Sequence, residues 1–206
     1  GFAMRQYLIP DSGRFYKANL HCHTTCSDGK RTPQEIKEIY MAEGYSIVAY
    51  TDHDILIPHD ELNDENFLAL YGYEVQLDKW NSDDYADTQT CHICLIAMNR
   101  SVDYPVASAR TGYKVGNAVN YVHYLKFRDD QPDFEREYSV ECVNKVFKEG
   151  REQNYFVTYN HPTWSLETYP DYMGYNGMHA FEMYNGGCLA VGYLDYHPRI
   201  YDDMLM

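Results

Sequence analysis

Short apolar runs alternate with amphipathic stretches along this chain, and each pattern predicts its own kind of element. Apolar runs predict strands at residues 17–21, 46–50, 72–77, 92–98, 155–159 and 179–184. Apolar residues at helical spacing predict helices at residues 33–44, 61–70, 115–125, 140–152 and near the C-terminus. Nearly continuous apolar strands separated by helices are typical of a parallel sheet covered on its faces. The pattern therefore predicts an α/β fold.

The first helix carries the clearest local signal. Thr32 followed by Pro33 and Glu35 predicts a capping box with proline in the first turn. Gly44 predicts the C-terminal end of this helix. No Pro- or Gly-rich linker and no internal repeat divides the sequence, so residues 1–206 are expected to form one domain, with the polar residues 78–90 as a surface insertion.

Composition and charge narrow the classes of function. A hydrophobic fraction of 45% and a charged fraction of 23% are ordinary for a globular protein. No apolar run approaches the roughly 20 residues of a membrane span, so we expect a cytoplasmic protein that contacts no membrane. The net charge of −14 argues against binding of duplex nucleic acid, which depends on Lys and Arg neutralising phosphates. Residues 1–3 are expected to be a non-native addition, because Gly1 cannot be an initiator.

Cysteine usage predicts reduced, mostly buried thiols. Cys91 and Cys94 have the spacing of half a zinc ribbon, but no second pair of this kind follows, which argues against a structural zinc site. Most of the 6 cysteines lie in apolar stretches, where a free thiol behaves as a small hydrophobe.

The candidate chemistry begins with His21 and His23 at the end of the first predicted strand. Residues two apart on a strand point to the same side, about 6.6 Å apart, and their imidazoles can reach one metal ion. In a chain with 9 histidines such a pair is weak evidence by itself. Further His and acidic residues at other predicted strands strengthen it: Asp28, Asp52, His53, Glu74, His92 and His161. Because catalytic groups of parallel α/β folds gather where strands end, we expect these side chains to meet.

These residues, in this order and spacing, resemble the PHP family (polymerase and histidinol phosphatase), most closely its nucleotide-phosphoesterase branch. The resemblance covers residues 17–185 and rests on His21-x-His23-x(4)-Asp28-Gly29, Thr51-Asp52-His53-Asp54, Glu74, His92 and Asn160-His161-Pro162. It implies a distorted (β/α)7 barrel that holds two to three divalent metal ions. Histidinol-phosphate phosphatases of the family usually have His where this chain has Asp28, which favours a nucleotide substrate.

The resemblance also implies a role for each site residue. His21 and His23 would bind a first metal, and Glu74 would bridge it to a second. His92 and His161 would complete the shell of the second metal, while Asp28 and His53 would bind a third. Asp52 would assist catalysis by accepting the other N–H of an imidazole. Imidazoles with a bridging carboxylate suit Mn, Zn or Fe, and Mg is a further candidate.

The implied activity is that of a hydrolase, a metal-dependent phosphoesterase in which a metal-activated hydroxide attacks phosphorus. Its expected partner is a small phosphorylated substrate, a nucleotide or a short oligonucleotide. The sequence names neither a general acid nor an oligomeric state. It also leaves the phosphate-binding cations unranked among Lys30, Arg31, Arg100, Lys114 and Lys126.

One part of the chain departs from the family pattern. Members end their last strand with Asp-x-His, and Asp195 and His197 match that spelling. The surrounding residues, however, predict a turn entering a helix and no buried strand. We therefore expect a barrel incomplete at the C-terminus, without its last strand, in which two of the three metal sites lack a ligand.

Two alternatives remain open. One is a histidinol-phosphate-type monoester phosphatase, and the other is a PHP-like module whose incomplete metal site is not catalytic. For single residues, His92 could be a core histidine, Glu74 a buried ion-pair partner, and Glu182 either structural or directed at the site. Surface or packing roles are expected for His59, His123, His179 and His197.

Overall fold

A computed structural model describes residues 9–80 and 82–206 of the chain. The expectation for residues 1–3 therefore lies outside the described residues. The strands are β1 (Ala18–Cys22), β2 (Ile47–Tyr50), β3 (Leu68–Asp78), β4 (Thr90–Ala97), β5 (Tyr155–Asn160) and β6 (Ala180–Phe181). The α-helices are α1 (Pro33–Ala42), α2 (Val140–Glu152), α3 (Tyr169–Tyr172), α4 (Gly186–Ala190) and α5 (Pro198–Leu205). Short 3-10 segments are η1 (Asp60–Leu62), η2 (Tyr85–Asp87) and η3 (Gly116–Tyr124).

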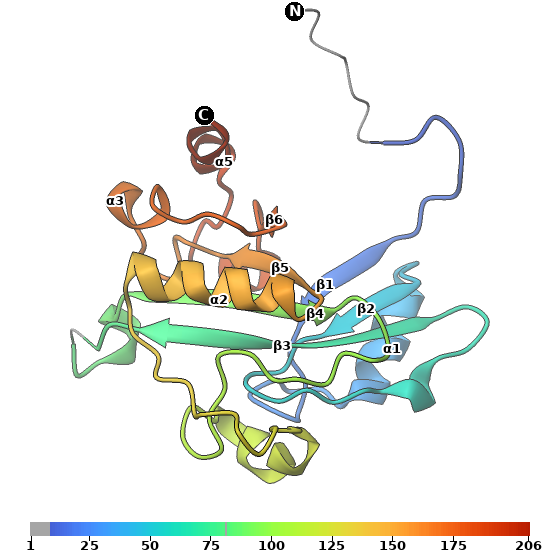
Figure 1. The fold of residues 1–206 in the computed structure, drawn as a ribbon. Helices are drawn as coiled ribbons and strands as arrows, with labels where there is room; N and C mark the ends of the chain where they lie inside the picture. Colours follow the sequence, from blue (N-terminus) through green and yellow to red (C-terminus); the bar gives the residue numbers. More distant parts are fainter. Residues whose placement is uncertain (1–8, 81) are drawn as a thin grey trace, which may run out of the picture.

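The strands form one curved, 6-stranded sheet in the order β1-β2-β3-β4-β5-β6 (Figure 1). β1, β2 and β3 run parallel, and so do β5 and β6. β4, however, is antiparallel to both β3 and β5, so the expectation of a parallel sheet is wrong for the centre of the fold. Every residue of β4 is buried, and this burial on both faces produces the continuous apolar run that is typical of a parallel strand. The sheet agrees with part of a PHP-like barrel, but the described strands do not establish a (β/α)7 count.

The predicted helices are confirmed in three of their four central positions. α1 begins with the expected capping box, in which the Thr32 hydroxyl accepts from the Glu35 N–H at 3.2 Å. α2 coincides with its prediction, and residues 115–125 contain a 3-10 helix. The helix predicted at residues 61–70 is wrong. After one turn, the Asn63 side chain accepts from the Ala69 N–H at 2.7 Å, and this local bond competes with the helix.

Both long helices pack on one face of the sheet, and the opposite face is left for the site. On β3 the alternating residues Tyr73, Val75 and Leu77 pack in a core with Val143 and Phe147 of α2. A second core joins α1 to the same face of β1 and β2. Figure 1 shows α2 lying along β5 and α1 beside β2. Side chains one position further along β3 and β4 therefore point to the other face.

Within the described residues, none of the helices combines the length and apolarity that a membrane crossing requires.

Candidate metal centre

The sheet face opposite α1 and α2, where the short helix α4 also lines the cavity, brings together all the residues predicted to bind metal. They come from β1, the loop that follows it, the segment after β2, strands β3 and β4, and the end of β5. All of them line one cavity of about 270 Å³: His21, His23, Asp28, His53, Glu74, His92 and His161. The expected meeting of these side chains is therefore found, although their roles as ligands stay predictions.

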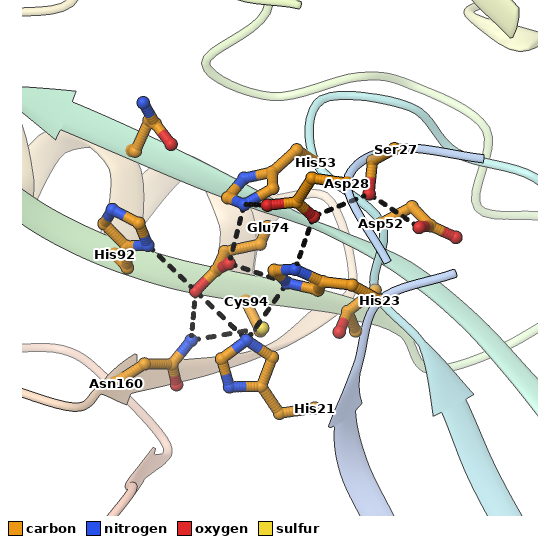
Figure 2. A network of polar contacts seen from close by, with 12 residues as sticks. His21, His23, Ser27, Asp28, Asp52, His53, Glu74, His92, Cys94 and Asn160 are labelled. Atoms are coloured by element: carbon orange, nitrogen blue, oxygen red, sulfur yellow. Dashed lines mark hydrogen bonds and ion pairs between the residues drawn. The ribbon is translucent and has the colours of Figure 1, made fainter. Parts of the chain in front are cut away.

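Glu74 lies at the centre of this group (Figure 2). Its Oε1 atom is 3.2 Å from His21 Nε2, 3.3 Å from His92 Nδ1 and 3.4 Å from His161 Nε2. Its Oε2 atom is 2.9 Å from His23 Nε2 and 3.5 Å from His53 Nε2. The two oxygens of one carboxylate thus face two different sets of imidazoles, which is the arrangement that a bridging ligand needs.

Three buried polar atoms of residues at the centre have no hydrogen bond of good geometry among the described residues: Glu74 Oε2, His92 Nδ1 and His53 Nδ1. Glu74 Oε2 lies 2.9 Å from His23 Nε2, and His92 Nδ1 lies 3.3 Å from Glu74 Oε1. Buried polar atoms are normally satisfied, so an unpaired acceptor here indicates space for a cation. Groups of ligand atoms within 4.8 Å of one another are formed by His23, His53 and Glu74, and by Glu74, His92 and His161. This donor set of imidazoles and a carboxylate fits divalent metals, and it suits Zn, Mn or Fe.

For Glu74, His53 and His92, the electrostatics of the centre favour the protonation states that bind metal. Burial by itself would raise the pKa of Glu74, but the imidazoles of His21, His92 and His161 hold it well below its usual value. Burial lowers the pKa of His53 to about 3, and it also lowers the pKa of His92. Glu74 is therefore ionised, while these two imidazoles are neutral and keep a free lone pair.

His21 and His23 behave differently from the other imidazoles. Burial would lower the pKa of His23, but the neighbouring carboxylates of Asp28 and Glu74 raise it to about 9. His23 Nδ1 lies 2.9 Å from Asp28 Oδ1, so this carboxylate orients the ring. His21 Nδ1 lies 2.7 Å from Glu182 Oε2. The open assignment of Glu182 is thereby settled, since its carboxylate contacts a ring at the site.

The expectation for Asp52 is wrong in one respect. Its carboxylate accepts from the Thr24 N–H at 2.6 Å, the Thr24 hydroxyl at 2.8 Å and the Ser27 hydroxyl at 2.6 Å. Among the described residues it has no hydrogen bond to an imidazole, although Cys26 and His59 lie nearby. His53 points at Glu74, so the preceding side chain points the other way. Asp52 therefore fixes the loop that carries His23 and Asp28, and a catalytic role for it stays a prediction.

Asp195 and His197 do not complete the cavity. Asp195 accepts from the Thr163 N–H at 3.1 Å and the Trp164 N–H at 2.9 Å, and it lies 2.5 Å from His197 Nε2. The pair braces the loop after His161, and neither residue lines the cavity. As expected, residues 192–197 lead through a turn into α5, and their sheet-like pairing within the described chain is an isolated bridge.

The sequence reasoning missed three residues at the centre. Trp164 lines the cavity, with its ring centroid 5.2 Å from that of His92. The Asn160 amide donates to Glu74 Oε1 at 3.2 Å and lies 3.1 Å from Cys94 Sγ. Cys94 could have been found, because it lies two residues after His92 on the same strand face. The candidate phosphate-binding cations do not line this cavity.

Some known proteins are similar to this chain in sequence or in structure. No protein-family model matches the chain. It is similar to a 5′-3′ exoribonuclease of Haemophilus influenzae, with 42% identity over 45 residues, which is 22% of this chain and 16% of that protein. The chain thus spans a small part of the relative it matches.

Two solved structures are also similar. One is a "putative metal-dependent phosphoesterase" from Bifidobacterium adolescentis, with a TM-score of 0.52, 16% identity, and coverage of 94% of this chain and 83% of that one. The other is a two-domain protein from Bacteroides vulgatus containing a predicted PHP-like metal-dependent phosphoesterase, with a TM-score of 0.43, 18% identity, and coverage of 91% and 54%.

Proposed function

We propose that this chain is a metal-dependent phosphoesterase that hydrolyses a phosphate ester of a nucleotide or short oligonucleotide. Its motifs resemble the PHP family, and its fold is similar to that of the Bifidobacterium adolescentis structure. The observation that carries the proposal is Glu74, a fully buried carboxylate with imidazoles facing each of its two oxygens. A buried charge of this kind is costly unless it is paired, and a pair of cations satisfies it fully.

Each group of side chains has a distinct part in the proposed site. His21, His92 and His161 face Glu74 Oε1 and would hold one metal with it, whereas His23 and His53 face Glu74 Oε2 and would hold another. This grouping separates His21 from His23, which the sequence resemblance assigns to one metal. Divalent ions held in this way lower the pKa of a bound water and polarise phosphoryl oxygens. The chain itself supplies neutral imidazoles at His53 and His92, an ionised carboxylate at Glu74, and the carboxylates of Asp28 and Glu182, which orient the rings of His23 and His21.

The nucleotide substrate is supported by two observations. The 45-residue similarity is to a protein that acts on RNA. In addition, Asp28 stands where the histidinol branch usually has His. The net charge of −14 disfavours binding of a nucleic-acid duplex. Divalent ions bound in the cavity would make its local field positive, so a small anion could still bind there.

The direct test combines elemental analysis with an activity assay. We expect the purified chain to bind Mn, Zn or Fe, and to release phosphate from 3′,5′-bisphosphonucleotides faster than from histidinol phosphate. His161→Ala should remove metal and activity, because it deletes a ligand that faces Glu74. His123→Ala, which changes an exposed histidine, is the matched control. Absence of both metal and turnover would overturn the proposal.

A second candidate is a PHP-like module that binds metal without catalysis. It is favoured by Asp195 and His197, which bond to each other and brace a loop when the family pattern would place them at the metals. Stoichiometric metal with no turnover on any phosphoester of the panel would favour this module over the enzyme.

A further inference from the structure

A row of aromatic side chains leads away from the metal centre. Trp164 lines the metal cavity, and its ring centroid lies 5.1 Å from that of His161. The Tyr85 centroid follows at 6.4 Å from Trp164, and the Trp80 centroid at 5.7 Å from Tyr85. The chain has 2 tryptophans, and both belong to this row. We call Trp164, Tyr85 and Trp80 the aromatic row.

The middle of the aromatic row is anchored to the sheet. The Tyr85 hydroxyl donates to Asp78 Oδ1 at 3.1 Å and lies 3.4 Å from His92 Nε2. The turn that carries Tyr85 is capped by the Asp84 side chain, which accepts from the Ala86 N–H at 3.0 Å. A ring that is held in place before binding loses little conformational entropy when a ligand arrives.

The outer end of the aromatic row opens onto a second cavity of about 410 Å³. Trp80 lines this cavity together with Tyr113 and Lys114, and it is 66% exposed. The cavity adjoins the metal centre through Gln76, which lines it and pairs with His92 across β3 and β4.

The other wall of this cavity is tied to the rim of the metal centre. A Cβ atom on Gly116 would lie 2.4 Å from the Ser27 carbonyl oxygen, next to Asp28. Gly116 also has a φ of +56°, a conformation that favours glycine. The segment that carries Lys114 therefore stays in close contact with the loop of Asp28.

We propose that the aromatic row is the leaving-group subsite, and that it takes the base of a nucleoside whose phosphate lies in the metal cavity. This inference rests on the proposed phosphoesterase activity. Aromatic faces and edges bind planar rings of any base, so the subsite selects nucleosides without selecting among bases. The row extends two rings beyond Trp164, farther than the short side chain of an amino alcohol would use.

The first test compares two substrates that share a 5′-phosphate on ribose and differ in the base: adenosine 5′-monophosphate and ribose 5-phosphate. The native chain should prefer the nucleotide. Trp80→Ala should raise KM for the nucleotide about tenfold and leave ribose 5-phosphate unchanged, because stacking on one ring is lost. Trp80→Phe should restore most of the preference. Phe15→Ala removes an exposed ring elsewhere (80% exposed) and should change the KM of neither substrate.

The second test reads binding without turnover. In Trp164→Phe the remaining tryptophan is Trp80, and adenosine 5′-monophosphate should quench its fluorescence while ribose 5-phosphate should not. Hydrolysis of both compounds at equal kcat/KM, without selective quenching, would overturn the subsite and leave the phosphoesterase standing. Selective quenching without hydrolysis of any phosphoester would support the subsite and overturn the activity.

Discussion

Two buried glutamates in this fold, Glu74 and Glu167, have pKa values shifted in opposite directions. Glu74 faces imidazoles, and its pKa is held well below the usual value although burial opposes this. Glu167 faces hydroxyl groups: Tyr159 donates at 2.9 Å, Tyr175 at 2.5 Å and Tyr138 at 3.4 Å. Burial prevails there and raises the pKa of Glu167 to about 8. At neutral pH the carboxyl group of Glu74 is therefore ionised, whereas that of Glu167 is protonated.

The difference shows that burial alone does not decide the charge of a carboxyl group. An imidazole or a metal can carry the opposite charge, whereas a phenol can only donate a hydrogen bond. The two glutamates also differ in the parts of the fold that they connect. Glu74 gathers side chains from across the sheet, while Glu167 anchors the loop after β5, where its N–H donates to the Pro162 carbonyl at 2.9 Å.

The largest effect is expected from removing the charge of Glu74. In Glu74→Gln the two imidazole sets lose their common anion, so metal content should fall for both at once. Since metal ions supply several kcal/mol of transition-state stabilisation, phosphoesterase kcat/KM should drop about a thousandfold or more. Elemental analysis and steady-state kinetics check this. Glu65→Gln, at an exposed site, should retain both properties; a loss of one metal only would contradict a shared bridge.

Removing the ionisable group of Glu167 should change how stability depends on pH. In the native chain the folded pKa of about 8 lies above the unfolded value of 4.5, so folding stability decreases as pH rises through this window. Each pKa unit of difference is worth about 1.36 kcal/mol, which makes the decrease several kcal/mol. Glu167→Gln should abolish this slope, and urea unfolding at pH 5 and pH 8 measures it. An unchanged slope would mean that Glu167 is already ionised in the fold.

A smaller effect is expected at the contact between Glu182 and His21. Glu182 is held in place by the Asn185 amide, which donates to its Oε1 at 2.6 Å. Outer carboxylates that orient metal-binding imidazoles are worth 10- to 100-fold in metal affinity, so Glu182→Gln should weaken metal binding by about that factor. Metal titrations of both proteins provide the measurement. A loss as large as that of Glu74→Gln would place Glu182 among the ligands themselves.

The smallest effect is expected from removing one hydrogen bond to Glu167. Tyr175→Phe removes the shortest hydrogen bond to Glu167 without adding charge. The ionised carboxylate loses that bond, so the pKa of Glu167 should rise further by roughly one unit. The pH window over which stability decreases should then extend upward in the unfolding series. A shift downward would show that the hydroxyl stabilises the protonated form.

The sequence predicted which side chains meet in one cavity, because each lies within a strand or in the segment that follows one, and their role as metal ligands stays a prediction. Once β3 and β4 are placed, Glu74 and His92 can point only to one face or the other. What the sequence could not supply is contact between distant segments. Nothing local indicates that Glu182 contacts His21 in particular, or that the rings of Trp164 and Tyr85 lie side by side, because these pairings depend on the loops between strands.

Two predictions about the fold are wrong, for β4 and for residues 61–70, and both fail because a local pattern does not report tertiary packing. The continuous apolar run of β4 predicts a parallel strand, but such a run indicates only burial on both faces and not the direction of the strand. Residues 61–70 were expected to be helical from their apolar spacing, but Leu62 and Phe67 instead enter the core from a turn and from the segment before β3. In both places tertiary packing overrode a local pattern.

The side chains around Glu74 come from segments far apart in the chain, from His21 near its start to His161 after β5. An unfolded chain cannot present them together, so an ion that binds here binds the folded form alone. Mass action then adds about 2.7 kcal/mol of stability when the free ion reaches 100 times its Kd. The free energy of unfolding therefore depends on the concentration of free ion. A chelator should lower the temperature at which the chain unfolds.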